Sequence, residues 1–311
     1  MNRGIAFGVG AYLVWGVLPI YWKALDTVDS LEILAHRVVW SVLLLGGIVG
    51  VRRSWPQIRS LGRRSVARLL IAGSLLTLNW ATYIWAVNNG HIVESSLGYF
   101  INPLLNVALG VLILRERLDT TQWLAIGIAT AGVAYMTIAA GSLPWIALVL
   151  ATSFAFYALL KKQMVALGPF ESLTVEIALV LVPAVVFLVV LAGNGNGSFG
   201  TAGPRITVLL ILTGLATALP LLLFGAAATR IRLSTIGLLQ YTAPTIQFLI
   251  GVFVYDEIVG RDRLIGFVLV WFALALYTGS GLVRRRRTPS RKRRTGMALN
   301  NHSLCCRITP A

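Results

Sequence analysis

Four ionisable side chains interrupt the strongly apolar segments of this sequence: His36, Arg37, Glu94 and Glu176. Arg37 is the most informative, because an arginine near the middle of a bilayer costs roughly 2.5–3.5 kcal/mol even on a lenient insertion scale. We therefore expect it to face a cavity or a partner. It could bind a carboxylate or phosphate group of a substrate, or it could form an ion pair with Glu94 that changes during transport. A structural ion pair, or snorkelling toward the outer interface, is the competing interpretation.

Conventional catalytic and metal-binding patterns are missing from the sequence. His36 could relay protons, although a structurally hydrogen-bonded histidine is the alternative, and with His91 and His302 it gives no set of metal ligands. The two cysteines, Cys305 and Cys306, are adjacent and cannot staple a fold. Walker loops, dinucleotide fingerprints and catalytic triads are also absent, so we expect neither an enzyme nor a cofactor.

Polar side chains gather on single faces of otherwise apolar segments. They are Asn79, Trp80 and Tyr83 in one segment, Tyr99, Asn102 and Asn106 in the next, and Gln240, Tyr241 and Gln247 much later. Spacings of three and four residues place such groups on one side of a helix. We predict that Tyr99, Asn102 and the Gln240–Tyr241 pair line a central polar pocket. Asn106 and Gln247 are assigned to hydrogen bonds between helices, which remain the alternative for the whole set.

A repeat of 141 residues relates two of these segments without a gap. Pro103 matches Pro244 within it. The other matched pairs are Leu97 with Leu238, Phe100 with Tyr241, Gly110 with Gly251, and Glu116 with Glu257. A proline inside a helix frees a carbonyl about four residues earlier, and in a membrane that group needs protein or a water-lined cavity. Two copies of one helical unit with matching breaks are typical of a transporter whose solute site lies at the breaks.

Composition places the chain in a membrane. Hydrophobic residues make up 57% and charged residues 12% of the 311 residues, and the mean hydropathy is +0.79. Runs of about 20 apolar residues are long enough to cross the hydrocarbon core. They span approximately 4–22, 31–51, 69–87, 92–114, 121–140, 143–160, 172–192, 206–227, 233–255 and 264–283. We therefore predict an all-α integral membrane protein of ten transmembrane helices.

The charges predict the orientation of these helices. With the N-terminus inside, thirteen Lys and Arg precede the tail on the inner side and four lie outside, which favours cytoplasmic termini. Five helices in each copy is an odd number, so the second copy must be inverted. The predicted units are 1–141 and 142–283, followed by a basic tail over 284–311. A tail directly after a membrane helix favours contact with anionic lipid over nucleic acid.

Several motifs resemble the RarD branch of the EamA family, in the drug/metabolite transporter superfamily. They are Ala11–Gly16, Leu34–Ser41, Trp85–Asn89, Glu94–Leu104 and Ala228–Thr235. The resemblance covers about 4–283 and excludes the basic tail. It implies a carrier of the bacterial cytoplasmic (inner) membrane that works by alternating access around a central cavity. Members of the superfamily move amino acids, nucleotide sugars, sugar phosphates and drugs, so the resemblance leaves the substrate open.

These observations lead to one expected function and two alternatives. We expect a secondary active transporter of a small polar metabolite or drug, working by export or exchange with a proton as the candidate coupling ion. A membrane receptor or scaffold that does not transport is the alternative from another class, and the repeat argues against it. A membrane-embedded enzyme is third, because the sequence offers no reactive constellation.

Overall fold

The structure is a computed structural model, and it describes residues 3–88, 92–139, 145–164, 167–255 and 260–287. All regular elements within these ranges are helices. They are α1 (Arg3–Lys23), α2 (Ser30–Val51), α3 (Trp55–Arg59), α4 (Arg63–Asn88), α5 (Ile92–Leu112), α6 (Thr120–Ala139), α7 (Trp145–Gln163), α8 (Pro169–Ala178), α9 (Leu181–Gly193), α10 (Pro204–Ala228), α11 (Leu233–Gln240), α12 (Thr242–Val254) and α13 (Arg261–Arg287). The predicted all-α class is confirmed. The tail beyond 287, with its cysteines and His302, lies outside the described residues.

Each of the ten predicted apolar segments coincides with one helix or with two consecutive helices. Among the described residues, six segments are long and apolar enough to cross a membrane, and α8 with α9 makes a seventh if the bent pair is one span. The described apolar parts of α5 and α13 are shorter, at Gly98–Leu112 and Leu264–Tyr277. The structure therefore supports six to seven candidate spans, and the count of ten stays a prediction.

The two predicted helix breaks behave differently. The break at Pro103 is wrong, because α5 continues through this proline. Close by, the Tyr241 hydroxyl donates to the Phe100 carbonyl at 3.1 Å, so a packed partner helps to satisfy backbone there. The second copy is interrupted near the expected place, at Tyr241 between α11 and α12, three residues before Pro244.

A sharper bend was not predicted. It lies between α8 and α9, whose axes differ by 53°. Pro183 lies in the first turn of α9. Backbone N–H groups in a first turn have no acceptor within the helix, so the absence of this group in proline costs little there.

Side chains that cap helix ends explain where several elements begin. The Asp29 carboxylate accepts from the backbone N–H groups of Leu31 and Glu32 at the start of α2. Asp119 and Gln122 bond to each other's backbone N–H before α6, each at 2.9 Å. Glu116 reaches a different helix, because it accepts from the first two N–H groups of α11. This contact ties the turn after α5 to the start of α11.

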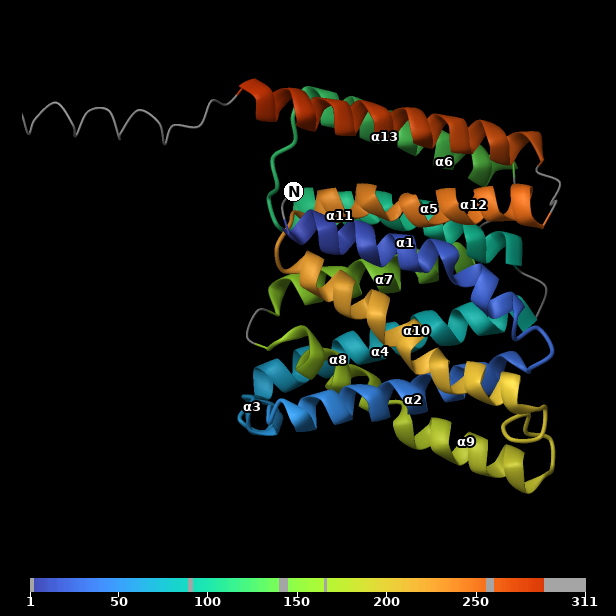
Figure 1. Cartoon of the computed structure of the whole chain (residues 1–311). Helices are drawn as coiled ribbons and strands as arrows, with labels where there is room; N and C mark the ends of the chain where they lie inside the picture. Colours follow the sequence, from blue (N-terminus) through green and yellow to red (C-terminus); the bar gives the residue numbers. More distant parts are fainter. Residues whose placement is uncertain (1–2, 89–91, 140–144, 165–166, 256–259, 288–311) are drawn as a thin grey trace, which may run out of the picture.

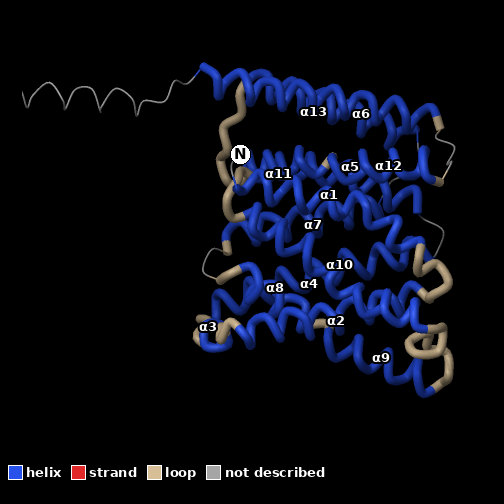
Figure 2. The backbone as a smooth tube through the Cα atoms, in the orientation of Figure 1, coloured by secondary structure: helices blue, strands red, loops and turns tan. Residues whose placement is uncertain are grey.

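The helices form a layered bundle with roughly aligned axes (Figures 1 and 2). α6 and α13 pack side by side at one edge, whereas α2 and α9 lie at the opposite edge (Figure 1). α1 begins and α13 ends at the same end of the bundle, which also carries α3. We call it the basic end, since it carries basic residues at or just beyond the helix ends: Arg52, Arg59, Arg63, Lys162 and Arg230.

The packing repeats with the shift of 141 residues. This shift carries α1 onto α7, α4 onto α10, and α5 onto α11 with α12. In the structure α1 packs against α10 and α12, and α7 packs against the matching partners α4 and α5. Phe100 and Tyr241 are themselves 141 residues apart and share a hydrogen bond.

One glycine sets the closest approach between α2 and α10. A Cβ added to Gly214 would lie 2.5 Å from the backbone carbon of Trp40, so only glycine allows the two backbones to come this near. The Ser41 hydroxyl donates to the Gly214 carbonyl at 3.1 Å, which fixes the register. This contact positions Arg37 on α2 against Thr217 on α10.

Candidate functional site

Arg37 lies in the middle third of α2, where it meets α1, α4 and α10. Its Nε donates to the Thr217 hydroxyl at 2.9 Å. The guanidinium carbon lies 4.9 Å from the ring centroid of Trp22 and 5.1 Å from that of Trp80. Both distances are within the range of cation–π attraction. The side chain is half-buried, so one hydroxyl and two indole rings take the place of part of its hydration.

Three tyrosines complete the surroundings of the guanidinium. The hydroxyls of Tyr21, Tyr83 and Tyr99 lie close enough to interact with Arg37 electrostatically. The Tyr21 hydroxyl donates a hydrogen bond to the Leu209 carbonyl. Tyr83 and Tyr99 pack against each other with ring centroids 6.2 Å apart and remain 37% and 43% exposed. We call Arg37, Thr217 and these five aromatic residues the Arg37 cluster.

The guanidinium has N–H donors that none of the described residues uses. An arginine has five N–H groups, and Thr217 accepts from one of them. The two terminal nitrogens bond to none of the residues that the structure describes, and none of the described carboxylates forms an ion pair with Arg37. A planar cation with a free fork of donors suits a carboxylate or phosphate in two-point contact. The surrounding rings suit an apolar or aromatic group beside that anion.

Two other predicted pocket residues, Asn102 on α5 and Gln240 on α11, lie elsewhere, in a buried network. Asn106 donates to the side-chain oxygens of Asn102 and Gln240, both at 2.9 Å. Asn102 donates in turn to the Ala151 carbonyl of α7 at 2.8 Å. Asn102 is 2% and Gln240 7% exposed, and the network joins three helices. This network consists of hydrogen bonds between helices. On this face of α5, the sequence predicts such a role for Asn106 alone.

Other predicted site residues also bond to protein. Tyr241 is buried and reaches the Phe100 carbonyl, whereas Gln247 donates to the Trp15 carbonyl at 3.1 Å. Asn79 lies beside Trp80 in sequence but faces α7, where it donates to the Leu150 carbonyl at 2.8 Å and to the Ser153 hydroxyl at 3.0 Å. The structure therefore brings together Arg37, Trp80 and Tyr99 from the predicted set.

His36 points away from the Arg37 cluster, toward the loop before α10. Its Nδ1 accepts from the Trp40 indole at 3.2 Å, and its ring lies 5.0 Å from that of Phe199. Glu32 lies 3.8 Å from the other ring nitrogen and accepts from the backbone N–H groups of Ser198 and Phe199. The side chain of Glu94, the partner proposed for Arg37, lies outside the described residues.

A second cation, Lys161, is buried, which we did not predict from the sequence. Lys161, which the charge count placed in a cytoplasmic loop, pairs with Glu176 at 2.9 Å. The Ser172 hydroxyl lies 2.8 Å from the lysine, and Tyr157 donates to the other oxygen of Glu176 at 3.1 Å. The pair is nearly inaccessible to solvent, and it joins the end of α7 to α8. The sequence does indicate this pair, because Lys161 and Glu176 lie on the two sides of the short connection between α7 and α8.

Candidate metal ligands do not gather among the described side chains, where no three His, Cys, Asp or Glu residues come together. Thr217 and Trp22 were also missed as members of the Arg37 cluster. Thr217 lies 180 residues from Arg37, so nothing local in the sequence links the two.

Comparisons with known proteins agree with this architecture. Residues 2–138 match the EamA-like transporter family. Protein RarD of Streptomyces exfoliatus is 46% identical over 93% of this chain and 92% of its own length. Protein RarD of Escherichia coli K12 is 40% identical over 92% and 97%, and an uncharacterized transporter of Vibrio cholerae is 41% identical over 90% and 93%.

A solved crystal structure has the same fold. It superimposes with a TM-score of 0.66 over 92% of this chain and 99% of its own, at 16% identity. The apolar helices and the bacterial relatives together support a multi-pass protein of the inner membrane. The chain therefore belongs to the EamA-like transporter family and is homologous to the RarD proteins.

Proposed function

We propose that the chain is a secondary active transporter of a small polar metabolite or drug that carries an anionic group. The observation that carries this proposal is Arg37, which lies among aromatic rings from three helices, α1, α4 and α5, and whose terminal N–H donors have no partner among the described residues. The carboxylate or phosphate of the solute binds this fork, and its apolar part packs against Trp22, Trp80 and Tyr99. Export or exchange by alternating access is the expected mode.

The repeat supports the transport mechanism. Ten spans in two inverted copies would place α1 and α7, and likewise α4 and α10, in equivalent positions on opposite sides of one axis. The matched packing partners of these helices and the Phe100–Tyr241 contact agree with that symmetry. A twofold axis in the membrane plane gives two conformations of similar energy, open to opposite sides. The buried Asn102–Asn106–Gln240 network holds α5, α7 and α11 together during the exchange.

The Arg37 cluster also suggests how energy is coupled. Two anionic solutes compete for one fixed cation. Exchange of one solute for the other can therefore proceed without a separate coupling ion. A proton remains the candidate coupling ion where net export occurs. Cytoplasmic termini and contact of the basic tail with anionic lipid complete the proposal, on the strength of the charge distribution.

The test is uptake driven by a pH gradient into proteoliposomes that contain the purified protein. The panel comprises amino acids, sugar phosphates and chloramphenicol. Wild type is compared with Arg37→Ala and with Arg59→Ala, a matched control because Arg59 is exposed on α3. We expect saturable, gradient-sensitive uptake of at least one compound, a loss of tenfold or more in Arg37→Ala, and a change below twofold in Arg59→Ala.

Two results would contradict the proposal. Undiminished uptake in Arg37→Ala would remove Arg37 from the solute path. Tight binding of a panel compound without any flux, in protein shown to be folded and reconstituted, would assign the chain to the class of membrane receptors or scaffolds.

A further inference from the structure

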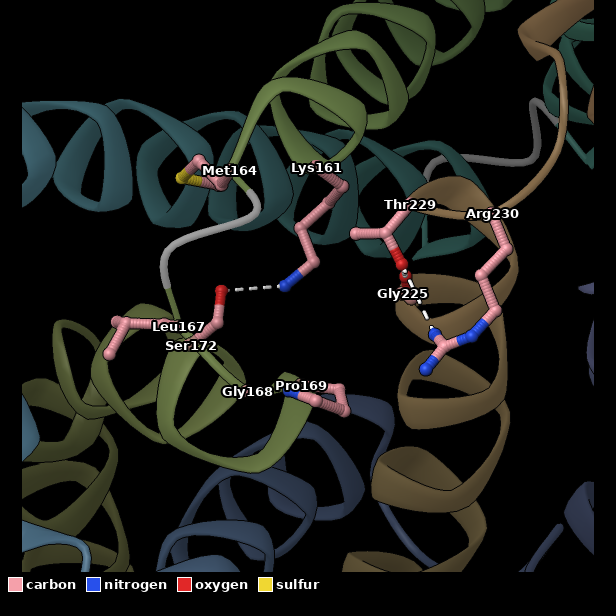
Figure 3. Close-up of a pocket in the computed structure, with 9 residues that line it drawn as sticks. All are labelled: Lys161, Met164, Leu167, Gly168, Pro169, Ser172, Gly225, Thr229 and Arg230. Atoms are coloured by element: carbon pink, nitrogen blue, oxygen red, sulfur yellow. Dashed lines mark hydrogen bonds between the residues drawn. The ribbon is translucent and has the colours of Figure 1, made fainter.

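A separate polar cavity of about 270 Å³ lies at the basic end of the bundle, where α7 and α10 end and α8 begins (Figure 3). Its lining includes Lys161, Gly168, Ser172, Thr229 and Arg230. A volume near the lower limit of known ligand pockets holds one small polar group rather than a whole drug-sized molecule.

Two cations approach this cavity from different helices. Figure 3 shows the amino group of Lys161 and the guanidinium of Arg230 directed into the same space from opposite sides. An ammonium has three N–H donors, and Ser172 and Glu176 account for two of those on Lys161. The third remains free of described acceptors and is available to an oxygen atom in the cavity.

Arg230 is held in place while most of its donors stay open. One terminal nitrogen, Nη1, donates to the Ala226 carbonyl at 2.7 Å and to the Thr229 hydroxyl at 3.2 Å, and the guanidinium lies 5.5 Å from the Phe7 ring centroid. Nε and Nη2 form no hydrogen bond with any described residue. A guanidinium oriented by fixed contacts loses little further conformational entropy when it binds an anion.

The charge balance of the cavity is positive. Glu176 neutralises Lys161, but none of the described carboxylates pairs with Arg230. Glu171 is buried and folds back against Gly168, in the first turn of α8, where the positive end of that helix dipole offsets roughly half of its charge. One uncompensated guanidinium, one spare ammonium donor and two hydroxyls therefore face the same small space.

We propose that this cavity is a binding site for an oxyanion, a phosphate or carboxylate group, with Arg230 as its principal ligand and Lys161 as its second. The group belongs either to a free solute or to the headgroup of an anionic lipid. The site is distinct from the Arg37 cluster, and its occupancy does not depend on transport, so equilibrium binding tests it even if the proposed function is wrong.

The experiment is calorimetric titration of inorganic phosphate into the purified full-length protein in neutral detergent. We expect saturable binding to the wild type and a loss of at least tenfold in Arg230→Gln. The matched control is Arg232→Gln, because Arg232 is a neighbouring exposed arginine that donates to the Arg117 carbonyl and does not line the cavity. Its affinity should stay within twofold of the wild type. Equal affinity in Arg230→Gln, or equal losses in both variants, would overturn the proposal.

A second variant tests the role of Lys161 without leaving a buried charge unpaired. Lys161→Met combined with Glu176→Gln removes both charges of the ion pair together. We expect this double variant to bind phosphate at least threefold more weakly, with a melting temperature close to that of the wild type. Unchanged affinity in a folded double variant would remove Lys161 from the site and contradict the two-cation geometry.

The source of the oxyanion follows from a repeat of the titration in nanodiscs of phosphatidylglycerol. Phosphate affinity that persists there, and still depends on Arg230, assigns the site to a free solute. Affinity that is present in detergent but lost in phosphatidylglycerol assigns it to a lipid headgroup that occupies the cavity. Both results support an oxyanion site, whereas absence of phosphate binding in detergent refutes it.

Discussion

Arg37 and Lys161 are both cations within the helical bundle, but their surroundings differ. Lys161 is nearly inaccessible, and Glu176 and Ser172 bond to it with tight geometry. Arg37 is half-buried, has one hydroxyl and two indole rings beside it, and pairs with none of the described carboxylates. The Lys161–Glu176 pair neutralises its own charge, whereas none of the described residues neutralises the charge of Arg37 or uses its terminal donors.

The contrast shows why burial of a charge alone does not identify a functional residue. A charge that is neutralised by a neighbour can be kept for the packing of helices, as Lys161 and Glu176 are between α7 and α8. A charge surrounded by aromatic rings and a lone hydroxyl has lost hydration without gaining an opposite charge. That energetic deficit is what a bound anion would relieve.

The largest effect that separates the two cations is expected for Lys161→Met. Removal of the lysine leaves Glu176 buried and unpaired, which should lower the free energy of unfolding by about 3–5 kcal/mol. Denaturation of the protein in mixed micelles measures the change. Lys161→Met with Glu176→Gln should recover most of the loss, and Lys23→Met, at an exposed site, should have little effect. A mild effect of Lys161→Met alone would mean that the pair is not structural.

Gly214→Ala should have the next largest effect, through the scaffold of the Arg37 cluster. The added methyl would lie 2.5 Å from the backbone of Trp40, so α10 must move away from α2 at a cost of about 1–3 kcal/mol. Gly127→Ala is the control, since a methyl there meets no described atom. Equal stability of the two variants in the same denaturation assay would show that α2 and α10 are not tightly apposed.

Thr217→Val should have a smaller effect and should act on transport. Valine keeps the shape of threonine but removes the acceptor for Nε of Arg37. Loss of one hydrogen bond of about 1 kcal/mol lowers the uptake rate roughly fivefold. Thr213→Val is the comparison on the same helix, because its hydroxyl donates to the Leu210 carbonyl instead. Equal uptake rates of the two variants would contradict the positioning role of Thr217.

The smallest effect on stability is expected for Arg37→Gln. The variant loses two cation–π contacts of about 0.5–1 kcal/mol each, but it also avoids the cost of holding a charge among apolar helices. The free energy of unfolding should therefore change by less than about 1 kcal/mol. A loss as large as that of Lys161→Met would place Arg37 in the structural class.

Much of the fold could be predicted from the lengths of the apolar runs, because helices in lipid must satisfy their own backbone. The effect of single prolines could not. Pro103 was expected to break a helix, yet α5 continues past it with Tyr241 packed nearby. The bend between α8 and α9 depends on how two short helices pack on α2, and tertiary contacts decide that.

The site was predicted in part. Arg37 stood out by the cost of its charge, and Trp80 and Tyr99 by their positions on polar faces. Asn102 and Gln240 also lie on polar faces, but both accept hydrogen bonds from Asn106 in the core. Helical periodicity gives the face of a helix and not the partner that covers it. Thr217 could not be predicted for the same reason, since its contact with Arg37 exists only in the folded bundle.

The most direct test of an uncompensated charge at Arg37 uses a cysteine placed beside it. Tyr99→Cys is introduced in a background with Cys305→Ser and Cys306→Ser, with either Arg37 or Arg37→Gln. The measurement is the labelling rate with an anionic and with a cationic methanethiosulfonate of similar size. We predict an anionic-to-cationic rate ratio about tenfold higher when Arg37 is present, as expected for one unit charge within several ångströms in a watery site. The same ratio with arginine and with glutamine would show that the charge is already neutralised, and would contradict the account.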